Sequence, residues 1–245
     1  MDVPQAAANA DTASASPPSS RGEARVESAG DLGADDHVVR RLDRTRRVIA
    51  KRLGEAWRDC VPVTLHAELP VSGAEQRAAE LGVSFYDLVV DAVIRTLAEQ
   101  SRFNATFDGD AVTEYQSVNL AVAVDTRRGL VAPVLQRADL HGAVREQRAA
   151  RKELTRRALE GELKFADLSG ATFTLSNLGT LGISHFTPII NPPQVAILGT
   201  GVVRRDVDGI PQLYVSFTFD HRVNDGADAA RFLALFGRKL SVTSK

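Results

Sequence analysis

The chain has 245 residues, of which 44% are hydrophobic and 25% are charged, a composition ordinary for a soluble globular protein. Its formal net charge of −1 gives no overall field that would favour a nucleic acid or an anionic membrane as partner. A single cysteine, Cys60, excludes an intrachain disulfide and a cysteine-based zinc site, and we expect no metal. We find neither a membrane-length apolar run nor a signal-peptide pattern, and we expect a cytoplasmic protein.

The first segment differs in composition from the rest. Residues 1–36 are rich in Ala, Ser, Pro, Gly and Asp, with almost no large apolar side chains. Such a segment buries too little apolar surface to offset its ordering entropy, so we predict a disordered N-terminal tail. Residues 37–245 show no second linker and no internal repeat, which predicts one folded domain.

Helical and extended patterns alternate along the folded part. In chain order they predict a helix over 43–57, a strand over 61–69, a helix over 84–100, a strand over 117–125, a basic amphipathic helix over roughly 142–160, strands over 171–176, 194–203 and 212–219, and a helix over 226–240. Ser84 and Asp87 have the spacing of a capping box. Strands outnumber those of a simple βαβ repeat, which favours a two-layer α/β sandwich with a mixed sheet over a doubly wound sheet.

The most informative stretch joins the last strand to the last helix and reads DHRVNDG, residues 220–226. His221 follows an alternating, half-buried strand, so a general base could be held there rigidly. Asp225 stands where a carboxylate can cap the first amides of the helix. A histidine at a strand end is more often structural than catalytic, and spacing alone leaves both interpretations open. His66 could line a channel, although a hydrogen-bonded core histidine is the favoured interpretation.

This stretch resembles the DHRxxDG signature in the catalytic domain of the 2-oxo acid dehydrogenase acyltransferases (E2), whose fold is shared with chloramphenicol acetyltransferase. Three further stretches are similar and follow the family's order: LDRTRRVIAKRLGEAW, VNLAVAVDTRRGLVAPVL and FTLSNLGTLGISHFTPIINPPQVAILGTG. Together they cover about residues 41–240. The resemblance implies a chloramphenicol acetyltransferase-like α/β sandwich, acetyl-CoA as co-substrate and direct acyl transfer.

Three site residues are implied by the same resemblance. His221 corresponds to the general base, Ser176 to the serine that hydrogen-bonds the oxyanion, and Asp225 to an orienting group. We expect Arg46 or Arg47 to pair with Asp225. No residue is indicated for binding coenzyme A. The arginines over 142–160 could attract its phosphates, although a solvated face is the favoured interpretation. Cys60 as an acyl nucleophile lacks a paired histidine, which favours an inert thiol.

The acceptor is inferred from domain organisation. Neither a lipoyl domain nor a subunit-binding domain fits into residues 1–36, so we expect no covalently bound lipoyl group. The chain then resembles stand-alone acetyltransferases of tetronate polyketide antibiotic biosynthesis, which implies a small-molecule acceptor, the primary alcohol of a tetronate. The alternative is a dihydrolipoamide acyltransferase core that acts on lipoyl groups supplied in trans. A non-catalytic scaffold is a third interpretation, against which intact His221 and Ser176 argue.

The resemblance also implies an assembly. Members of the family place their site between neighbouring subunits of a trimer, with histidine and serine from different chains. We therefore expect a homotrimer in which His221 faces Ser176 of a neighbour.

Overall fold

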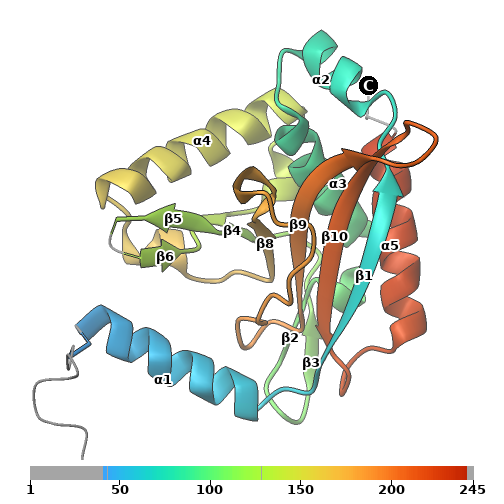
Figure 1. The fold of residues 1–245 in the computed structure, drawn as a ribbon. Helices are drawn as coiled ribbons and strands as arrows, with labels where there is room; N and C mark the ends of the chain where they lie inside the picture. The colour runs from blue at the N-terminus through green and yellow to red at the C-terminus, as the bar shows by residue number, and fades with distance from the viewer. Residues whose placement is uncertain (1–40, 43, 128, 242–245) are drawn as a thin grey trace, which may run out of the picture. The chain divides into compact units, whose positions relative to one another are not determined.

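The computed structural model describes residues 41–42, 44–127 and 129–241, and the predicted disordered tail lies outside these residues. All elements of the fold belong to the compact unit that starts at Leu42 (Figure 1). None of the described helices has the length and apolar character needed to cross a lipid bilayer.

A six-stranded mixed sheet forms the centre of the domain. Its strand order is β1 (Pro62–Pro70), β10 (Pro211–Asp220), β9 (Ala196–Arg205), β8 (Phe173–Asn177), β4 (Leu120–Val122) and β7 (Val134–Leu135). β8 runs parallel to both β4 and β9, and the other neighbours are antiparallel. The predicted strands over 61–69, 171–176, 194–203 and 212–219 are therefore confirmed within a few residues.

Helices cover one face of this sheet. The described residues form five α-helices, α1 (Arg44–Arg58), α2 (Ala74–Leu81), α3 (Phe85–Glu99), α4 (Val144–Glu160) and α5 (Gly226–Ser241). α3 and α5 pack side by side against the sheet (Figure 1). The core between the layers contains stacked aromatic rings, with Phe217 of β10 at 4.4 Å from Phe232 of α5. This is the predicted two-layer α/β sandwich.

Local chemistry explains where α3 begins and how α4 is held. The Asp87 amide donates to the Ser84 hydroxyl and the Ser84 amide donates to the Asp87 carboxylate, which is the predicted capping box. On α4, the Nε atom of Arg145 and the Nη1 atom of Arg148 donate to backbone carbonyls at the end of α2, each at 2.7 Å. Arg151 forms an ion pair with a carboxylate of α3. These arginines therefore join helices, which differs from the predicted solvated face.

The single strand predicted over 117–125 is wrong. The chain there forms β4 and then β5 (Val124–Thr126), which pairs with β6 (Gly129–Val131) in a separate two-stranded sheet. All residues of β4 are buried, and Ala121, which an alternating pattern places on the open face, is 2% exposed. An alternating sequence pattern thus predicts one buried face, whereas both faces of β4 are buried.

Several short elements carry no strong pattern and were not predicted. They are α2, the hairpin of β2 (Ala105–Phe107) and β3 (Val112–Glu114), β7, and the 3₁₀ turns Ser101–Phe103, Ala138–Leu140, Phe165–Leu168 and Gly179–Leu181. Elements of two to eight residues are too short to show a period, so their formation depends on tertiary contacts.

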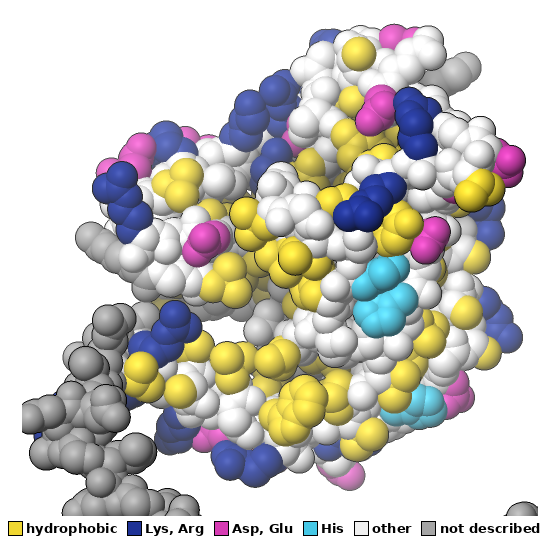
Figure 2. Space-filling model, in the orientation of Figure 1, with side chains coloured by type: hydrophobic (Ala, Val, Ile, Leu, Met, Phe, Trp, Pro, Cys, Tyr) yellow, Lys and Arg dark blue, Asp and Glu magenta, His cyan; other side chains and the backbone are white. Residues whose placement is uncertain are grey.

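The apolar face of α1 is mostly uncovered, although the helix itself is confirmed. Ala56 is buried, but Val48 and Leu53 are exposed, and Trp57 is 59% exposed. Hydrophobic side chains along α1 and on the neighbouring face of the domain are visible in Figure 2. The chain alone therefore does not bury the face that its sequence pattern marks as internal.

Candidate active site

His221 lies where the sequence predicts, directly after β10. The alternate residues of that strand are buried against α3 and α5, and the His221 amide donates to the Val61 carbonyl at 2.9 Å. The imidazole is exposed, and its ring centroid lies 5.7 Å from that of Phe219. Across the described part of the chain we find no hydrogen bond to the ring. The ring is therefore free to act on a group from outside this chain.

Asp225 holds the N-cap position of α5, but only through its backbone. Its carbonyl accepts from the Ala229 amide at 3.0 Å, while its exposed carboxylate makes no hydrogen bond to the described first-turn amides. The predicted side-chain cap is wrong, because the buried side chain at this junction is Asn224, which donates to the Arg102 carbonyl at 3.3 Å.

Of the two arginines expected to pair with Asp225, Arg47 has its described hydrogen bond elsewhere. The Nη1 atom of Arg47 donates to the Leu42 carbonyl at 3.2 Å, at the far end of α1 from β1. A helix rises about 1.5 Å per residue, so α1 carries Arg46 and Arg47 roughly 18 Å away from its junction with β1. The Asp225 carboxylate is exposed, and the hydrogen bond described for Arg47 goes to Leu42 instead.

Ser176 lies near the end of β8 and is half-buried. Its carbonyl accepts from the Thr200 hydroxyl of β9 at 3.4 Å. The loop that follows returns over β9 so closely that a Cβ atom on Gly201 would lie 1.9 Å from the Ser184 carbonyl oxygen. A side chain at position 201 of β9 would collide with this loop, so glycine there allows the loop to lie against the strand next to β8.

One chain does not bring His221 and Ser176 together. Strand pairing aligns Ser176 with Gly199 and Gly199 with Ser216, whereas His221 lies five positions beyond Ser216 on β10. Two strand spacings and five residue rises place the two backbones roughly 19 Å apart. Because β10 runs opposite to β8, the two residues lie toward opposite ends of the sheet (Figure 1).

A compact group of polar contacts lies under His221 and was not singled out from the sequence. The Asp220 carboxylate, 4% exposed, accepts from Nε and Nη2 of Arg222 at 3.0 and 2.6 Å, and from the Val61 amide at 3.4 Å. Burial alone would raise the pKa of Asp220, but these hydrogen bonds hold it below its usual value. Arg222 also donates to the Asp59 carbonyl and lies 4.9 Å from the centroid of Phe107.

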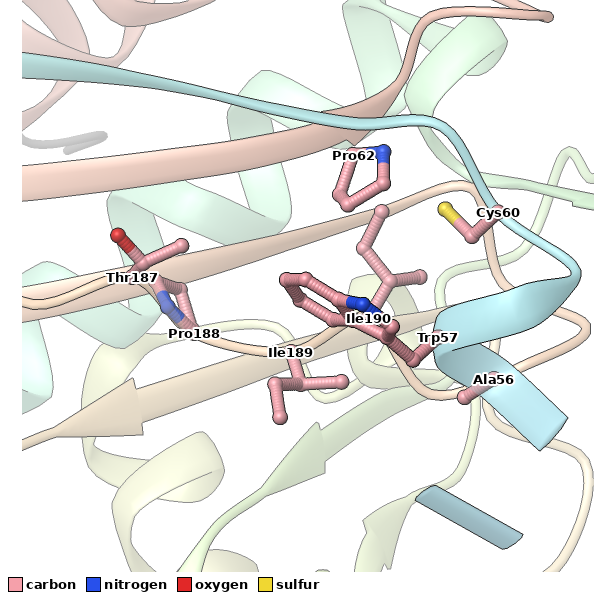
Figure 3. Close-up of a pocket in the computed structure, with 8 residues that line it drawn as sticks. All are labelled: Ala56, Trp57, Cys60, Pro62, Thr187, Pro188, Ile189 and Ile190. Atoms are coloured by element: carbon pink, nitrogen blue, oxygen red, sulfur yellow. The ribbon is translucent and has the colours of Figure 1, made fainter. Parts of the chain in front are cut away.

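Cys60 lies at the edge of the same group and is not a nucleophile. Burial, and then the adjacent Asp220 carboxylate, raise the pKa of the Cys60 thiol to about 12, so it stays protonated. Figure 3 shows Cys60 and Trp57 facing residues 187–190 around a small apolar pocket. The favoured interpretation of an inert thiol agrees with this setting.

The other histidine considered from the sequence is engaged elsewhere. Nδ1 of His66 lies 2.9 Å from the Ser216 hydroxyl, and its ring packs edge-on against His185 at 4.9 Å. Partial burial and repulsion from His185 lower the pKa of His66. His66 is hydrogen-bonded as expected but exposed, so it is not a core residue.

A cavity of about 330 Å³ opens on the helix side of the sheet, beside Tyr86 and Thr180. Asn177 lines it, and since side chains alternate along a strand, Ser176 points to the other face. Among residues 41–42, 44–127 and 129–241, no three His, Cys, Asp or Glu side chains are grouped as a metal would require.

Comparisons with known proteins place these features in a family. The family model of the 2-oxoacid dehydrogenases acyltransferase (catalytic domain) matches residues 34–244. The dihydrolipoyllysine-residue acetyltransferase component of the pyruvate dehydrogenase complex of Zymomonas mobilis is 32% identical, over 96% of this chain and 56% of that protein. The chain spans about half the length of the curated relatives it matches.

Solved structures agree with this similarity. Azotobacter vinelandii dihydrolipoamide acetyltransferase, studied for the roles of a serine, a histidine and an asparagine in its catalytic mechanism, is 30% identical with a TM-score of 0.77, covering 86% of this chain and 94% of its own. The cubic core of a pyruvate dehydrogenase multienzyme complex has a TM-score of 0.76 at 30% identity, with the same coverage. Chloramphenicol acetyltransferase, 19% identical over 78% of this chain and 92% of its own, shares the fold with a TM-score of 0.56. The resemblance seen in the motifs is confirmed, and the chain belongs to the 2-oxoacid dehydrogenase acyltransferase catalytic-domain family.

Proposed function

We propose that this domain transfers acetyl groups between coenzyme A and a dihydrolipoyl thiol, with His221 as general base and Ser176 as oxyanion donor. The observation that carries the proposal is the position of the two residues. Each lies at the end of a strand, and no described residue forms a hydrogen bond with its side chain. The relative studied for the roles of a serine and a histidine in its mechanism supports the assignment of the same residue types here.

The chemistry follows from these two groups. Neutral His221 takes the proton of the attacking thiol as its sulfur bonds to the thioester carbonyl carbon, which contributes about 10²–10⁴ in rate. Charge develops on the carbonyl oxygen, which accepts a hydrogen bond from the Ser176 hydroxyl. Cleavage of the original carbon–sulfur bond releases the second thiolate, and His221 returns the proton to it. Both substrates meet in one site, so no acyl-enzyme forms.

The separation of the two residues supports a site between chains. At roughly 19 Å apart within one chain, His221 and Ser176 can serve one reaction only if they come from two copies. The uncovered apolar face of α1, with Leu53 and Trp57, is a surface that a second copy would bury. A cubic core such as that of the related complex has threefold axes at its corners, which favours a homotrimer.

The comparisons favour a dihydrolipoyl acceptor over a tetronate alcohol. The curated relative is named for a dihydrolipoyllysine residue, and both related structures of high similarity belong to dihydrolipoamide acetyltransferase or a pyruvate dehydrogenase complex. The inference of an alcohol acceptor depends on the length of the segment before the domain. No side chain of the site supports it. It remains the competing outcome of the test.

That test offers acetyl-CoA with either dihydrolipoamide or a hydroxymethyl tetronate and follows both products by mass spectrometry, with His221→Ala as control. We expect acetyl-dihydrolipoamide from the wild type and a loss of at least tenfold in the variant. Acetylation of the tetronate with none of dihydrolipoamide would replace the proposed acceptor. Equal activity in the variant would remove His221 from the mechanism.

A further inference from the structure

The position of His221 is set by hydrogen bonds of the backbone at and next to this residue. Within the described residues its ring makes no hydrogen bond and contacts the ring of Phe219, so polar contacts hold His221 only through the Val61 carbonyl, which accepts from the His221 amide, and through the turn that follows. In that turn the amides of Val223 and Asn224 both donate to the Asp220 carbonyl, at 3.0 and 3.1 Å. A contact that fixes the side chain of Asp220 therefore also fixes the turn that carries His221.

Arg222 is the main partner of that side chain. Its Nε and Nη2 atoms donate a bidentate pair of hydrogen bonds to the Asp220 carboxylate. Nη2 also donates to the Asp59 carbonyl, which lies between α1 and β1. The Asp220 carboxylate also accepts a hydrogen bond from the Val61 amide, at the same junction of α1 and β1. The guanidinium thus ties the end of α1 and the start of β1 to the turn that carries His221.

We propose that Arg222 is a positioning residue for His221, and that its guanidinium closes the junction of α1 and β1 onto the catalytic turn. The proposal rests on the role proposed above for His221. Arg222 touches no reacting atom in this account. It acts by fixing where the imidazole points, and a general base loses rate steeply when it is misplaced by about an ångström.

Two observations separate this contact from an ordinary surface ion pair. Exposed pairs contribute little, and the Arg222 side chain is 38% exposed. The Asp220 carboxylate, however, is buried, so removing its cation leaves a charge without compensation and the turn must rearrange. The ring of Phe107 lies against the guanidinium, which confines it to one plane. A lysine offers neither the fork nor the flat stacking face.

The test compares Arg222→Gln, Arg222→Lys and Asp220→Asn with a matched control, Arg231→Gln, which breaks an exposed arginine–aspartate pair on α5. We expect Arg222→Gln to lower kcat by about 10- to 100-fold with an unchanged KM for acetyl-CoA, because positioning is lost and binding is not. The kcat of Arg222→Lys should lie between those of Arg222→Gln and the wild type, and the kcat of Arg231→Gln should equal that of the wild type. Guanidinium ion, far below concentrations that unfold proteins, should restore part of the activity of Arg222→Ala.

A second readout does not depend on activity. In ¹³C-histidine-labelled protein, with the signal assigned by its loss in His221→Ala, the His221 ring resonance should shift in Arg222→Gln and stay in place in Arg231→Gln. An unshifted resonance together with wild-type kcat in Arg222→Gln would overturn the proposal, as would a loss of activity that only follows the unfolded fraction. If the wild-type protein transfers no acetyl group, the proposed function fails, and the resonance still decides the role of Arg222.

Discussion

The local positions of His221 and Ser176 could be predicted from the sequence, but the distance between them could not. The motif around His221 predicts a residue at a strand end before a helix, and the structure has it there. The motif around Ser176 likewise predicts a serine at the end of a strand next to a glycine loop. Their separation within one chain could not be predicted, because it depends on strand order and direction, which no local pattern encodes.

Ser176→Ala should lower kcat by about 10²–10³, since loss of one oxyanion donor costs that much, and leave KM for acetyl-CoA nearly unchanged. Steady-state kinetics with acetyl-CoA and dihydrolipoamide measure both parameters. A large rise in KM at constant kcat would make Ser176 a binding group. An acetyl ester isolated on Ser176 would refute direct transfer.

Asp225→Ala should change stability little, because the carboxylate makes no cap bond that the substitution could remove. We expect the free energy of unfolding to change by less than about 0.5 kcal/mol, as at ordinary surface positions. Urea unfolding at neutral pH measures this, with Asp87→Ala as the comparison, because that side chain does complete a capping box. A loss near 1 kcal/mol in Asp225→Ala would restore the cap predicted from the sequence.

The buried Asp220 carboxylate predicts how stability depends on pH. Its pKa lies below the usual value of about 3.9, so its ionised form contributes stability above that value and loses it as pH falls through the folded pKa. Asp220→Asn should be less stable at pH 7 and should lose less stability between about pH 5 and 2 than the wild type. Urea unfolding across this range gives the slope. Identical slopes would show that Asp220 makes no such contribution.

At the scale of elements, long periodic segments were predictable and short ones were not. α3 and α5 follow from their apolar period, and the apolar residues spaced along one face of α5 are buried, namely Ala229, Phe232, Leu233, Phe236 and Leu240. β4 and β5 share one alternating segment, yet they belong to different sheets. The arginines of α4 look solvated in sequence, but several bind neighbouring helices, because only tertiary structure shows which carbonyls lie within reach.

α1 supplies a test of the uncovered surface. Leu53→Ser should weaken assembly without unfolding the domain, because Leu53 is exposed within the chain and would be buried only against another copy. Phe165→Ser, at a position 87% exposed near the end of α4, is the control. Light scattering should report a lower mass for Leu53→Ser alone, with an unchanged circular dichroism spectrum for both. A wild-type mass for Leu53→Ser would exclude this face from the interface.

At the scale of the whole molecule, the two residues that we propose as catalytic, His221 and Ser176, lie toward opposite ends of one sheet. The DHR turn ends β10, and the serine ends β8, which runs the other way. A cyclic assembly can place the first end of one copy against the second end of the next, so that each copy contributes to two sites. The family resemblance predicts this arrangement, and the opposite strand directions are compatible with it.

The most direct measurement of this account mixes two inactive proteins. His221→Ala and Ser176→Ala chains carrying different tags are co-expressed, and assemblies containing both are purified and assayed for acetyl transfer from acetyl-CoA to dihydrolipoamide. Each trimer that contains both chains pairs the intact histidine of one chain with the intact serine of the next at about one third of its interfaces. We therefore predict about a third of the wild-type activity from the purified mixed trimers and almost none from either variant alone. Purified mixed assemblies that stay as inactive as the single variants would contradict a site shared between chains.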